Sequence, residues 1–336
     1  MIIVDHERES SMLKRAIIGG IFGAAIIASG MPALHANVHA AATHKSYKIV
    51  LIAGIASDAF YITMSHGAAA EAKAEGASFQ FSGSPAAFSP STQLPYLNAA
   101  IAQHPDLILI APTDKVALQA PIARAIKAGI PVILVDTTLQ NPSIAATTIS
   151  SDNIAGGVAA ADALAAAIGK KGLVAGISTT PGVSTTDQRV QGFNQELKKF
   201  PGISNLPTVY ATDDATKAGS ILKGLVAAHH NLAGVFAMNV VTGDGVLAAA
   251  KEAGVAGKVK LVEFDAEPVQ VQAVKNGQIT ALIAQAPYTI GQMGVKLGIQ
   301  YLNGNHHLKA HYGTGEAIIT KANVSSAAVK NYLYSK

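Results

Sequence analysis

LILIAPTDKVALQAPIARAIKAGIPVILVD, which spans residues 107–136, contains one complete copy of the pattern on which the predicted fold rests. It begins with the apolar run Leu107–Ile110, passes through a loop and a helical stretch that ends in IKAGI, and closes with a second apolar run that Asp136 follows. Short, continuous, β-branched runs are typical of strands buried in a parallel sheet. The segment predicts a strand–helix–strand unit with an aspartate at the carboxyl end of its last strand.

A second segment, residues 234–265, repeats this order. Its sequence, GVFAMNVVTGDGVLAAAKEAGVAGKVKLVEFD, runs from an apolar strand through a helix that ends in KEAGV to a strand that Asp265 follows. Ligands of open α/β sheets bind at the carboxyl ends of the strands, so two facing units would bring Asp136 and Asp265 into one cleft. The alternative is that each aspartate only caps the turn after its strand. The duplication favours the cleft.

The alternation of strand and helix continues along the chain. Further strand-like runs are Ile49–Ala53, Leu173–Ile177 and Thr280–Ala284, besides Pro131–Val135 in the first segment, and further helical stretches are Tyr61–Glu75, Asn153–Ile168 and Asp187–Lys199. A chain of 336 residues, 49% of them hydrophobic, is long enough for two α/β lobes with buried cores. We therefore predict an α/β protein with two lobes.

Composition excludes several classes of protein. The net charge is +4, but the Lys and Arg residues are scattered, which argues against a nucleic-acid-binding surface. The chain has no cysteine, which excludes disulfides, thiolate metal sites and a lipidated N-terminal cysteine. The sequence also lacks a phosphate-binding loop, a dinucleotide-binding glycine motif at its first helix and the nucleophile elbow of hydrolases.

The remaining candidates for catalysis or metal binding are weak. His307 and His311 are spaced as two metal ligands on one helical turn, but Gly304 and Gly313 flank them, so we expect a solvated loop. Asp136 and the aspartate of the second unit could form a glycosidase pair, but two carboxylates that only recognise a ligand explain the same pattern. We therefore expect no enzyme, no cofactor and no metal.

The N-terminal segment reads as an export signal. Lys14 and the arginine after it precede the apolar run Ala16–Met31, and small residues that end at Ala40 suit a signal peptidase. The alternative is a membrane anchor, which needs about 20 apolar residues, more than this glycine-broken run provides. We expect a cleaved signal peptide of residues 1–40 and a periplasmic mature protein. The acidic residues before Lys14 are unusual for a signal and make Met12 an alternative start.

Nearly the whole mature chain resembles one known family. The matching residues are Ile49–Ile52, Ser57–Tyr61, Pro112–Asp114, Gly129–Val132, Ser151–Asn153, Gly156–Gly157, Arg189, Gly192–Phe193, Val235–Asn239, Glu263–Asp265, Ile283–Gln285 and Ile290–Gly291. Their order and spacing resemble those of type I periplasmic binding proteins, the solute-binding components of ABC transporters, and most of all the ribose-binding group. Each motif is weak by itself, whereas their ordered coincidence from Lys48 to about Asn305 is specific.

The resemblance implies two Rossmann-like lobes with parallel sheets, which a three-strand hinge joins and which close on a ligand. It implies an N-terminal lobe of residues 47–150 plus 286–314 and a C-terminal lobe of residues 151–285 plus 315–336. The implied ligand is a small sugar or polyol, and the implied partner is the permease of an ABC transporter. A chemoreceptor or sensor kinase is the alternative partner. We expect a monomer that binds no nucleic acid.

The resemblance also implies a set of ligand-binding residues. They are Asp58, Phe60, Tyr61, Asp136, Thr137, Arg189, Asp213, Asn239, Asp265 and Gln285. Sugars present hydroxyl groups that donate and accept, together with apolar ring faces, so carboxylates, amides and aromatic rings suit them. Asp136 and Asp265 would accept from hydroxyl pairs while Arg189 donates and balances their charge. Phe60 and Tyr61 would cover one face of the sugar, with a purely structural role in the core as the alternative.

Several positions depart from the family pattern. Asp58 stands where the family often has asparagine, and Thr137 stands where ribose-binding proteins have a second arginine. Asp213 aligns approximately with the aromatic residue that covers the far face of the sugar, with Tyr210 as the alternative wall. A serine and an asparagine of the first lobe are replaced as well, the former by Gly54 and the latter by an alanine at position 111. The departures argue against ribose itself and for a ligand with a different hydroxyl pattern.

Overall fold

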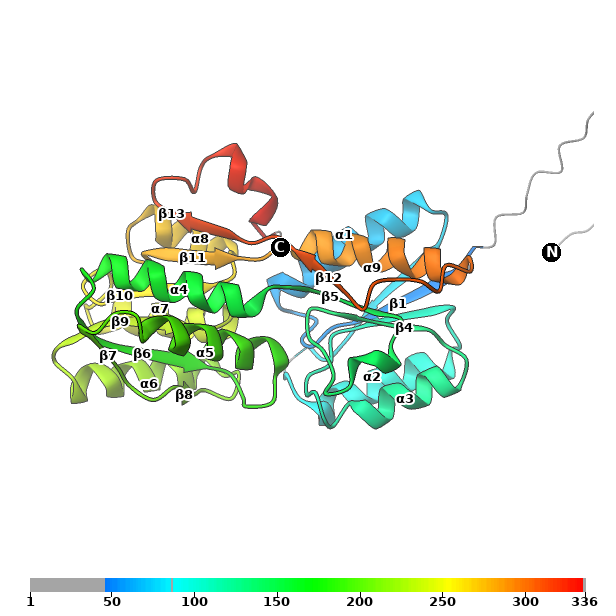
Figure 1. Cartoon of the computed structure of the whole chain (residues 1–336), viewed down its shortest axis with the longest axis horizontal. Coiled ribbons are helices and arrows are strands. Elements are labelled where there is room, and N and C mark those ends of the chain that lie inside the picture. The colour runs from blue at the N-terminus through cyan, green and yellow to red at the C-terminus, as the bar shows by residue number, and fades with distance from the viewer. Residues whose placement is uncertain (1–45, 86, 335–336) are drawn as a thin grey trace, which may run out of the picture. The chain divides into compact units, whose positions relative to one another are not determined.

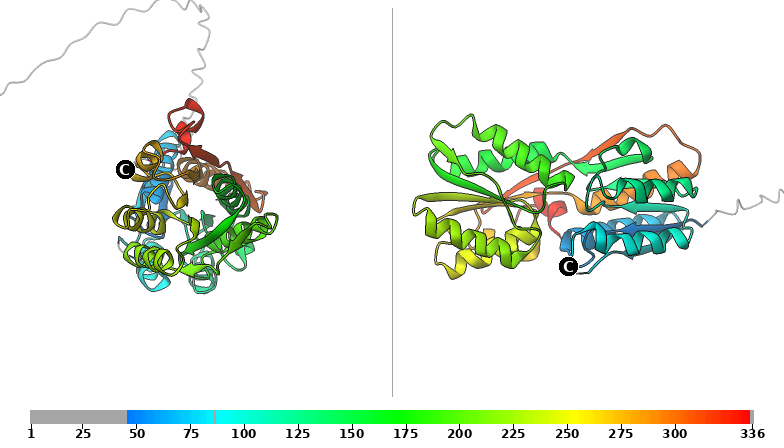
Figure 2. Two further views of the ribbon diagram at one scale, coloured as in Figure 1. Left: turned by 90° about the vertical axis from the view of Figure 1, so that its left-hand side faces the viewer. Right: turned by 90° about the horizontal axis from the view of Figure 1, so that it is seen from below.

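The computed structural model describes residues 46–85 and 87–334. The expected signal peptide, residues 1–40, lies outside these ranges. Within them, no helix is both long and apolar enough to cross a membrane. The described residues form two β-sheets, and helices cover both faces of each sheet (Figures 1 and 2).

The first sheet is parallel throughout. Its strands, in spatial order, are β12 (His311–Thr314), β5 (Thr147–Ser151), β4 (Val132–Val135), β3 (Leu107–Ile110), β1 (Lys48–Ile52) and β2 (Ser78–Ser82). Its helices are α1 (Ala59–Ala74) and α9 (Pro287–Leu302) on one face, and α2 (Pro90–Ala102) and α3 (Gln119–Lys127) on the other. Because side chains alternate along a strand, Leu109 joins the core beneath α1 and α9, and Ile108 joins the core beneath α2 and α3.

The second sheet has the same plan with one antiparallel edge. Its strands, in spatial order, are β13 (Ala317–Thr320), β11 (Ala281–Ala284), β10 (Lys260–Phe264), β9 (Leu232–Ala237), β6 (Gly172–Ser178) and β7 (Ile203–Asn205), and β8 (Val209–Tyr210) also pairs with β6. Its helices are α4 (Asn153–Ala167) and α5 (Ser184–Leu197) on one face, and α6 (Ala215–Ala228), α7 (Val240–Glu252) and α8 (Pro268–Lys275) on the other. Strand β13 runs antiparallel to β11.

The chain passes between the two sheets three times. The crossings follow β5, β11 and β12, and they lead to α4, α9 and β13 respectively. Two short 3-10 helices, Pro142–Ile144 and Ala327–Tyr332, lie outside the sheets. One local expectation was wrong: His311, which we placed in a loop, begins β12 and lies 3.0 Å from Ser150 Oγ through its Nε2. Parallel pairing with β5 requires extended backbone there.

Each sheet has helices that cross at backbone contact. A Cβ on Gly67 of α1 would lie 2.0 Å from the carbonyl oxygen of Tyr288 in α9. In the second sheet, a Cβ on Gly157 of α4 would lie 2.3 Å from the carbonyl oxygen of Arg189 in α5. Only glycine fits at such distances. These two glycines therefore determine how closely α1 packs on α9 and α5 on α4, and both α1 and α5 carry predicted site residues.

A cluster of buried carboxyl groups lies on the α7 and α8 face of the second sheet. Glu263 of β10 is fully buried, its Oε2 accepts from Gln270 Nε2 at 3.1 Å, and its Oε1 has no hydrogen-bond partner. Burial raises the pKa of Glu263 to about 8. Burial and the neighbouring Asp244 carboxyl raise the pKa of Glu267 to about 9. Both groups are therefore protonated in the folded protein at neutral pH.

We expect the folded state to lose stability as the pH rises from about 5 to 9. Between the ordinary pKa of 4.5 and the folded-state values of about 8 and 9, the unfolded chain releases protons that the folded protein retains, so stability falls across this interval and levels off above it. Each unit of pKa difference corresponds to about 1.4 kcal/mol. Urea denaturation across this range measures the slope, which Glu263→Gln should reduce and the exposed Glu75→Gln should leave unchanged. A wild-type slope near zero would show that these carboxyl groups ionise in the fold without penalty.

Candidate functional site

The duplicated aspartates occupy equivalent turns in the two sheets. Asp136 follows β4 and Asp265 follows β10, with φ angles of 63° and 77°. The backbone N–H of Asp136 donates to Ile149 O on β5, and that of Asp265 donates to Ile283 O on β11, both at 2.8 Å. A non-glycine residue in the left-handed region costs about 1 kcal/mol or more, and strained positions of this kind cluster at functional sites.

One cavity is lined by every residue to which the resemblance assigned a binding role. The lining is Asp58, Phe60, Tyr61, Phe88, Asp136, Thr137, Thr179, Val183, Thr185, Thr186, Arg189, Asp213, Asn239, Asp265 and Gln285. These residues come from loops and helix starts at the carboxyl ends of strands in both sheets. Of the two candidates for the far wall, Asp213 lies in the cavity lining and Tyr210 does not.

The start of α1 supplies one side of the cavity. Asp58 caps the helix, because its Oδ1 accepts from the backbone N–H of Phe60 at 2.8 Å. The rings of Phe60 and Tyr61 meet edge to face at 5.1 Å, and the Tyr61 hydroxyl donates to Asp136 Oδ2 at 2.8 Å. Burial raises the pKa of Asp136 to about 6, although Arg189 and the Tyr61 hydroxyl partly oppose this shift. Tyr61 is therefore both a wall and the hydrogen-bond partner of a carboxylate.

The side chain of Arg189 on α5 bonds mainly to residues of the second half of the molecule. Its Nε donates to Asn153 Oδ1 at 2.9 Å and its Nη1 donates to Met238 O at 2.7 Å. Its guanidinium carbon lies 3.6 Å from the centre of the Phe264 ring, which is a close cation–π contact. Protein acceptors thus already use part of the donor fork that we expected to face the ligand.

Asn239 and Asp213 form a second polar group. Asn239 caps α7, because its Oδ1 accepts from the backbone N–H of Thr242 at 3.0 Å. Its Nδ2 donates to Asp213 Oδ1 at 2.7 Å. Asp213 has a φ of 55°, and burial raises its pKa while the Asn239 amide lowers it. The helix cap therefore sets the position of the amide that holds Asp213.

Asp265 is the best-supported carboxylate in the cavity. Its Oδ1 accepts from Gln285 Nε2 and from the Tyr334 hydroxyl, both at 2.7 Å, and its Oδ2 accepts from the Val240 backbone N–H at 3.1 Å. The Tyr334 hydroxyl also accepts from the Gln285 backbone N–H at 3.3 Å. Sequence reasoning missed Tyr334, which lies far from every motif and whose ring centre is 5.8 Å from that of Phe60.

Phe88 was also missed, and it explains one departure from the family pattern. A Cβ on Gly54 would lie 2.2 Å from Cε2 of the Phe88 ring. The glycine that we interpreted as a lost sugar contact therefore makes room for an aromatic wall. No periodic pattern marks Phe88, because it lies in the loop between β2 and α2.

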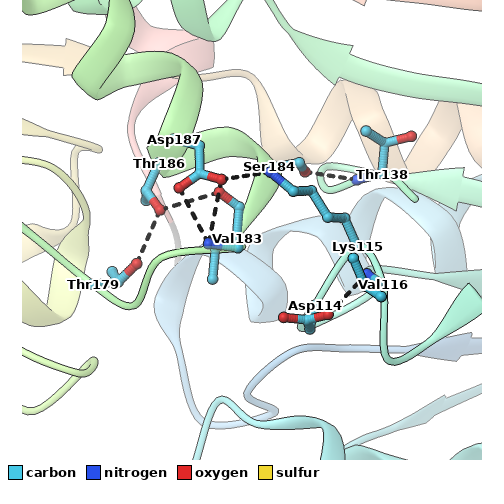
Figure 3. A network of polar contacts seen from close by, with 10 residues as sticks. Asp114, Lys115, Val116, Thr138, Thr179, Val183, Ser184, Thr186 and Asp187 are labelled. Carbon is cyan, nitrogen blue, oxygen red and sulfur yellow. Dashed lines mark hydrogen bonds and ion pairs between the residues drawn. The ribbon is translucent and has the colours of Figure 1, made fainter. Parts of the chain in front are cut away.

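Loops from the two sheets contact each other at the rim of the cavity (Figure 3). Lys115 Nζ, beside β3 of the first sheet, lies 2.8 Å from Asp187 Oδ2 of α5. The backbone N–H of Thr138 donates to Ser184 Oγ at 2.8 Å, and that of Lys115 donates to Gly182 O at 3.3 Å. These contacts connect the loops after β3 and β4 to the start of α5.

Comparison with known proteins identifies the family. A family model described as a periplasmic binding protein domain matches residues 49–306, and the chain belongs to this family. It is 31% identical over 291 residues to the ribose import binding protein of Salmonella typhimurium, covering 86% of this chain and 95% of that protein. It is 29% identical over 248 residues to the D-allose-binding periplasmic protein of Escherichia coli, covering 72% and 80%.

Solved structures confirm the fold class. An ABC transporter solute-binding protein from Agrobacterium vitis, bound with α-D-tagatopyranose, superposes with a TM-score of 0.84 at 44% identity and covers 87% of this chain and 100% of its own. A carbohydrate transporter solute-binding protein from Agrobacterium radiobacter, in complex with D-arabinose, has a TM-score of 0.82 at 31% identity and covers 86% and 99%. The chain is thus a type I binding protein and not an enzyme, as expected.

We expect Tyr334→Phe to destabilise the protein by about 1–3 kcal/mol, because it leaves a buried backbone N–H of Gln285 without an acceptor and removes one donor from Asp265. The phenyl ring keeps its packing against Phe60. Urea denaturation at pH 7 measures the loss. Tyr332→Phe is the matched control, because no hydrogen bond of the Tyr332 hydroxyl is found among the described residues. Equal stability of Tyr334→Phe and wild type would contradict this role of the hydroxyl.

Proposed function

We propose that this protein is the periplasmic sugar-binding component of an ABC transporter. The observation that carries the proposal is the single cavity in which aspartates from both sheets, Asp136 and Asp265, meet the aromatic side chains Phe60, Tyr61 and Phe88. Carboxylates accept hydrogen bonds from sugar hydroxyls, and aromatic rings pack on the apolar faces of the sugar. The relatives that bind ribose and allose, and the structural neighbours bound with tagatose and arabinose, support the same class of ligand.

The ligand that we propose is a monosaccharide or related polyol other than ribose. Thr137 contributes no positive charge where ribose-binding proteins carry an arginine, and its Oγ1 is buried without a hydrogen-bond partner. Asp213 takes the place of an aromatic wall, and Phe88 adds an aromatic side chain from another loop. The balance of polar and aromatic contacts therefore differs from that expected for ribose.

Binding would occur by closure of two lobes around the hinge. The proposed N-terminal lobe, residues 47–150 plus 286–314, contains the first sheet, and the proposed C-terminal lobe, residues 151–285 plus 315–336, contains the second. The rim contacts between Lys115 and Asp187 and between Thr138 and Ser184 would form on closure and separate on opening. A ligand that contacts both lobes stabilises the closed state, which a permease would then recognise.

Export would follow from a signal peptide of residues 1–40, cleaved near Ala40. Mass spectrometry of the protein recovered from a periplasmic fraction measures the cleavage point. A mature N-terminus at Ala41 supports the proposal, and an uncleaved N-terminus in the membrane fraction contradicts it.

We expect Asp136→Asn to weaken sugar binding about 10–100-fold, because hydrogen bonds to a charged group contribute about 1.5–3 kcal/mol. A thermal-shift screen with D-tagatose, D-allose, D-ribose, D-arabinose, D-galactose and polyols would find the sugar, since ligand at 1,000 times its Kd adds about 4 kcal/mol. Isothermal titration calorimetry then compares the variants. Asp162→Asn, an exposed change on α4, is the control. Absence of any shift in the screen would refute sugar binding, and wild-type affinity of Asp136→Asn would refute this role for Asp136.

We expect Lys115→Met to weaken the affinity for the sugar found in the screen about two- to fivefold at low salt, mainly through faster release. The Lys115–Asp187 pair is 39% and 30% exposed, and ion pairs of this kind contribute about 0–1 kcal/mol. Surface plasmon resonance measures the dissociation rate, and 0.5 M salt should abolish the difference by screening. Lys223→Met, which removes a pair with Glu252 on α6 and α7, should leave binding unchanged. An unaltered dissociation rate of Lys115→Met would show that the pair does not contribute to closure.

A further inference from the structure

The cavity contains more carboxylates than its cations balance. Among the described residues that line it, Asp58, Asp136, Asp213 and Asp265 are acidic and Arg189 alone is basic. Buried charges are tolerated only where opposite charges or hydrogen-bond donors compensate them. The donors around each carboxylate therefore determine what a ligand must supply.

Two of the carboxylates are well compensated by the protein. Asp265 accepts from Gln285, Tyr334 and the backbone of Val240. Asp136 accepts from the Tyr61 hydroxyl, and the positive charge of Arg189 lies near enough to lower its pKa. These two aspartates require little further positive charge.

Asp58 and Asp213 are compensated far less. Asp58 Oδ1 accepts the backbone N–H of Phe60, and Asp213 Oδ1 accepts the amide of Asn239. No hydrogen bond to a described residue is found for the second oxygen of either carboxylate. Burial raises the pKa of both, and the charges of Asp265 and Asp213 raise that of Asp58 further. Each of the two carboxylates thus has one donor in the protein, and the charge of Asp213 disfavours ionisation of Asp58.

The amide donors of the cavity and part of the Arg189 donor fork are already in use. Asn239 Nδ2 donates to Asp213, Gln285 Nε2 donates to Asp265, and Arg189 donates to Asn153 and to a backbone carbonyl. The Gln285 Oε1 atom is buried and has no partner. Because the amide donors are already engaged, the second oxygens of Asp58 and Asp213 remain available to accept hydrogen bonds from a ligand.

We propose that Asp58 and Asp213 act as a charge filter, which admits sugars whose hydroxyl or amine groups donate to them and excludes sugars that carry a carboxylate or phosphate. This inference rests on the proposed function. An anion would lie in a cavity of low effective dielectric beside uncompensated carboxylates, where repulsion is strong. A protonated amine would instead supply the positive charge that Arg189 does not deliver to this pair.

Matched ligands that differ only at carbon 6 test the filter. The probes are the aldoses D-galactose and D-allose, whose carbon 6 lies outside the pyranose ring, their 6-amino-6-deoxy analogues, and the corresponding acids D-galacturonate and D-alluronate. Calorimetry at pH 7.5 should give an amine-to-acid affinity ratio of at least 100 in a series whose neutral sugar binds. The double variant Asp58→Asn/Asp213→Asn should lower that ratio at least tenfold, whereas Asp162→Asn should not change it.

A second measurement does not depend on the ligand. Each of Asp58→Asn and Asp213→Asn, without ligand at pH 8, should raise the melting temperature, because the substitution replaces a carboxyl group whose ionisation burial disfavours with a neutral amide. A lowered melting temperature in both variants would show that the protein already compensates these charges and would overturn the filter.

The outcomes separate the filter from the proposed function. If the neutral sugars bind and the acids bind within threefold of them, sugar binding stands and the filter is wrong. If an acid binds and its neutral parent does not, the filter is likewise wrong. If no probe of either series and no compound of the thermal-shift screen binds, the proposed function fails and the filter fails with it.

Discussion

Carboxylates that leave water must find hydrogen-bond donors inside the protein, and this requirement organises the region between the two sheets. Asp265 meets it with donors from three separate parts of the chain: the start of α7, the end of β11 and the segment that carries Tyr334. One side chain therefore fixes the relative positions of three elements. Asp136 has a comparable role in the first sheet through the Tyr61 hydroxyl at the start of α1.

The glycine contacts between helices supply the rigid support for these hydrogen bonds. Gly157 brings α4 against the backbone of Arg189. This contact fixes the backbone position from which the Arg189 guanidinium donates to Asn153 and to the Met238 carbonyl. Gly67 brings α1 against α9 in the same way, and α1 carries Phe60 and Tyr61 on its first turn. In both halves of the molecule, a helix that carries site residues is thus placed by backbone contact instead of by long, adaptable side chains.

The sequence was most informative where burial leaves a regular pattern. The apolar runs predicted β1, β3, β4, β6, β9, β10 and β11, because strands covered on both faces contain few polar residues. Strands β2, β5, β7, β8, β12 and β13 were not predicted. Short or edge strands keep exposed positions and lack such runs, and the interior strand β5 consists mostly of threonine and serine. Helix α2 was also missed, and Pro95 in its interior hides its periodicity. The residues assigned from the resemblance all line one cavity. Phe88 joins this lining from a loop, and Tyr334 contacts Asp265 from the last described segment. Both were missed because their positions depend on tertiary packing alone.

The contact between Gly54 and Phe88 has a consequence for how such a receptor diverges. Gly54 is buried behind the ring of Phe88, and a side chain at this position would displace the ring from the wall of the cavity. A single methyl group added there would also lie 2.9 Å from the Tyr61 hydroxyl, which donates to Asp136. Gly54 therefore leaves room both for the aromatic wall and for the tyrosine that holds a carboxylate, so a substitution at this one position would change the shape and the polarity of the cavity together.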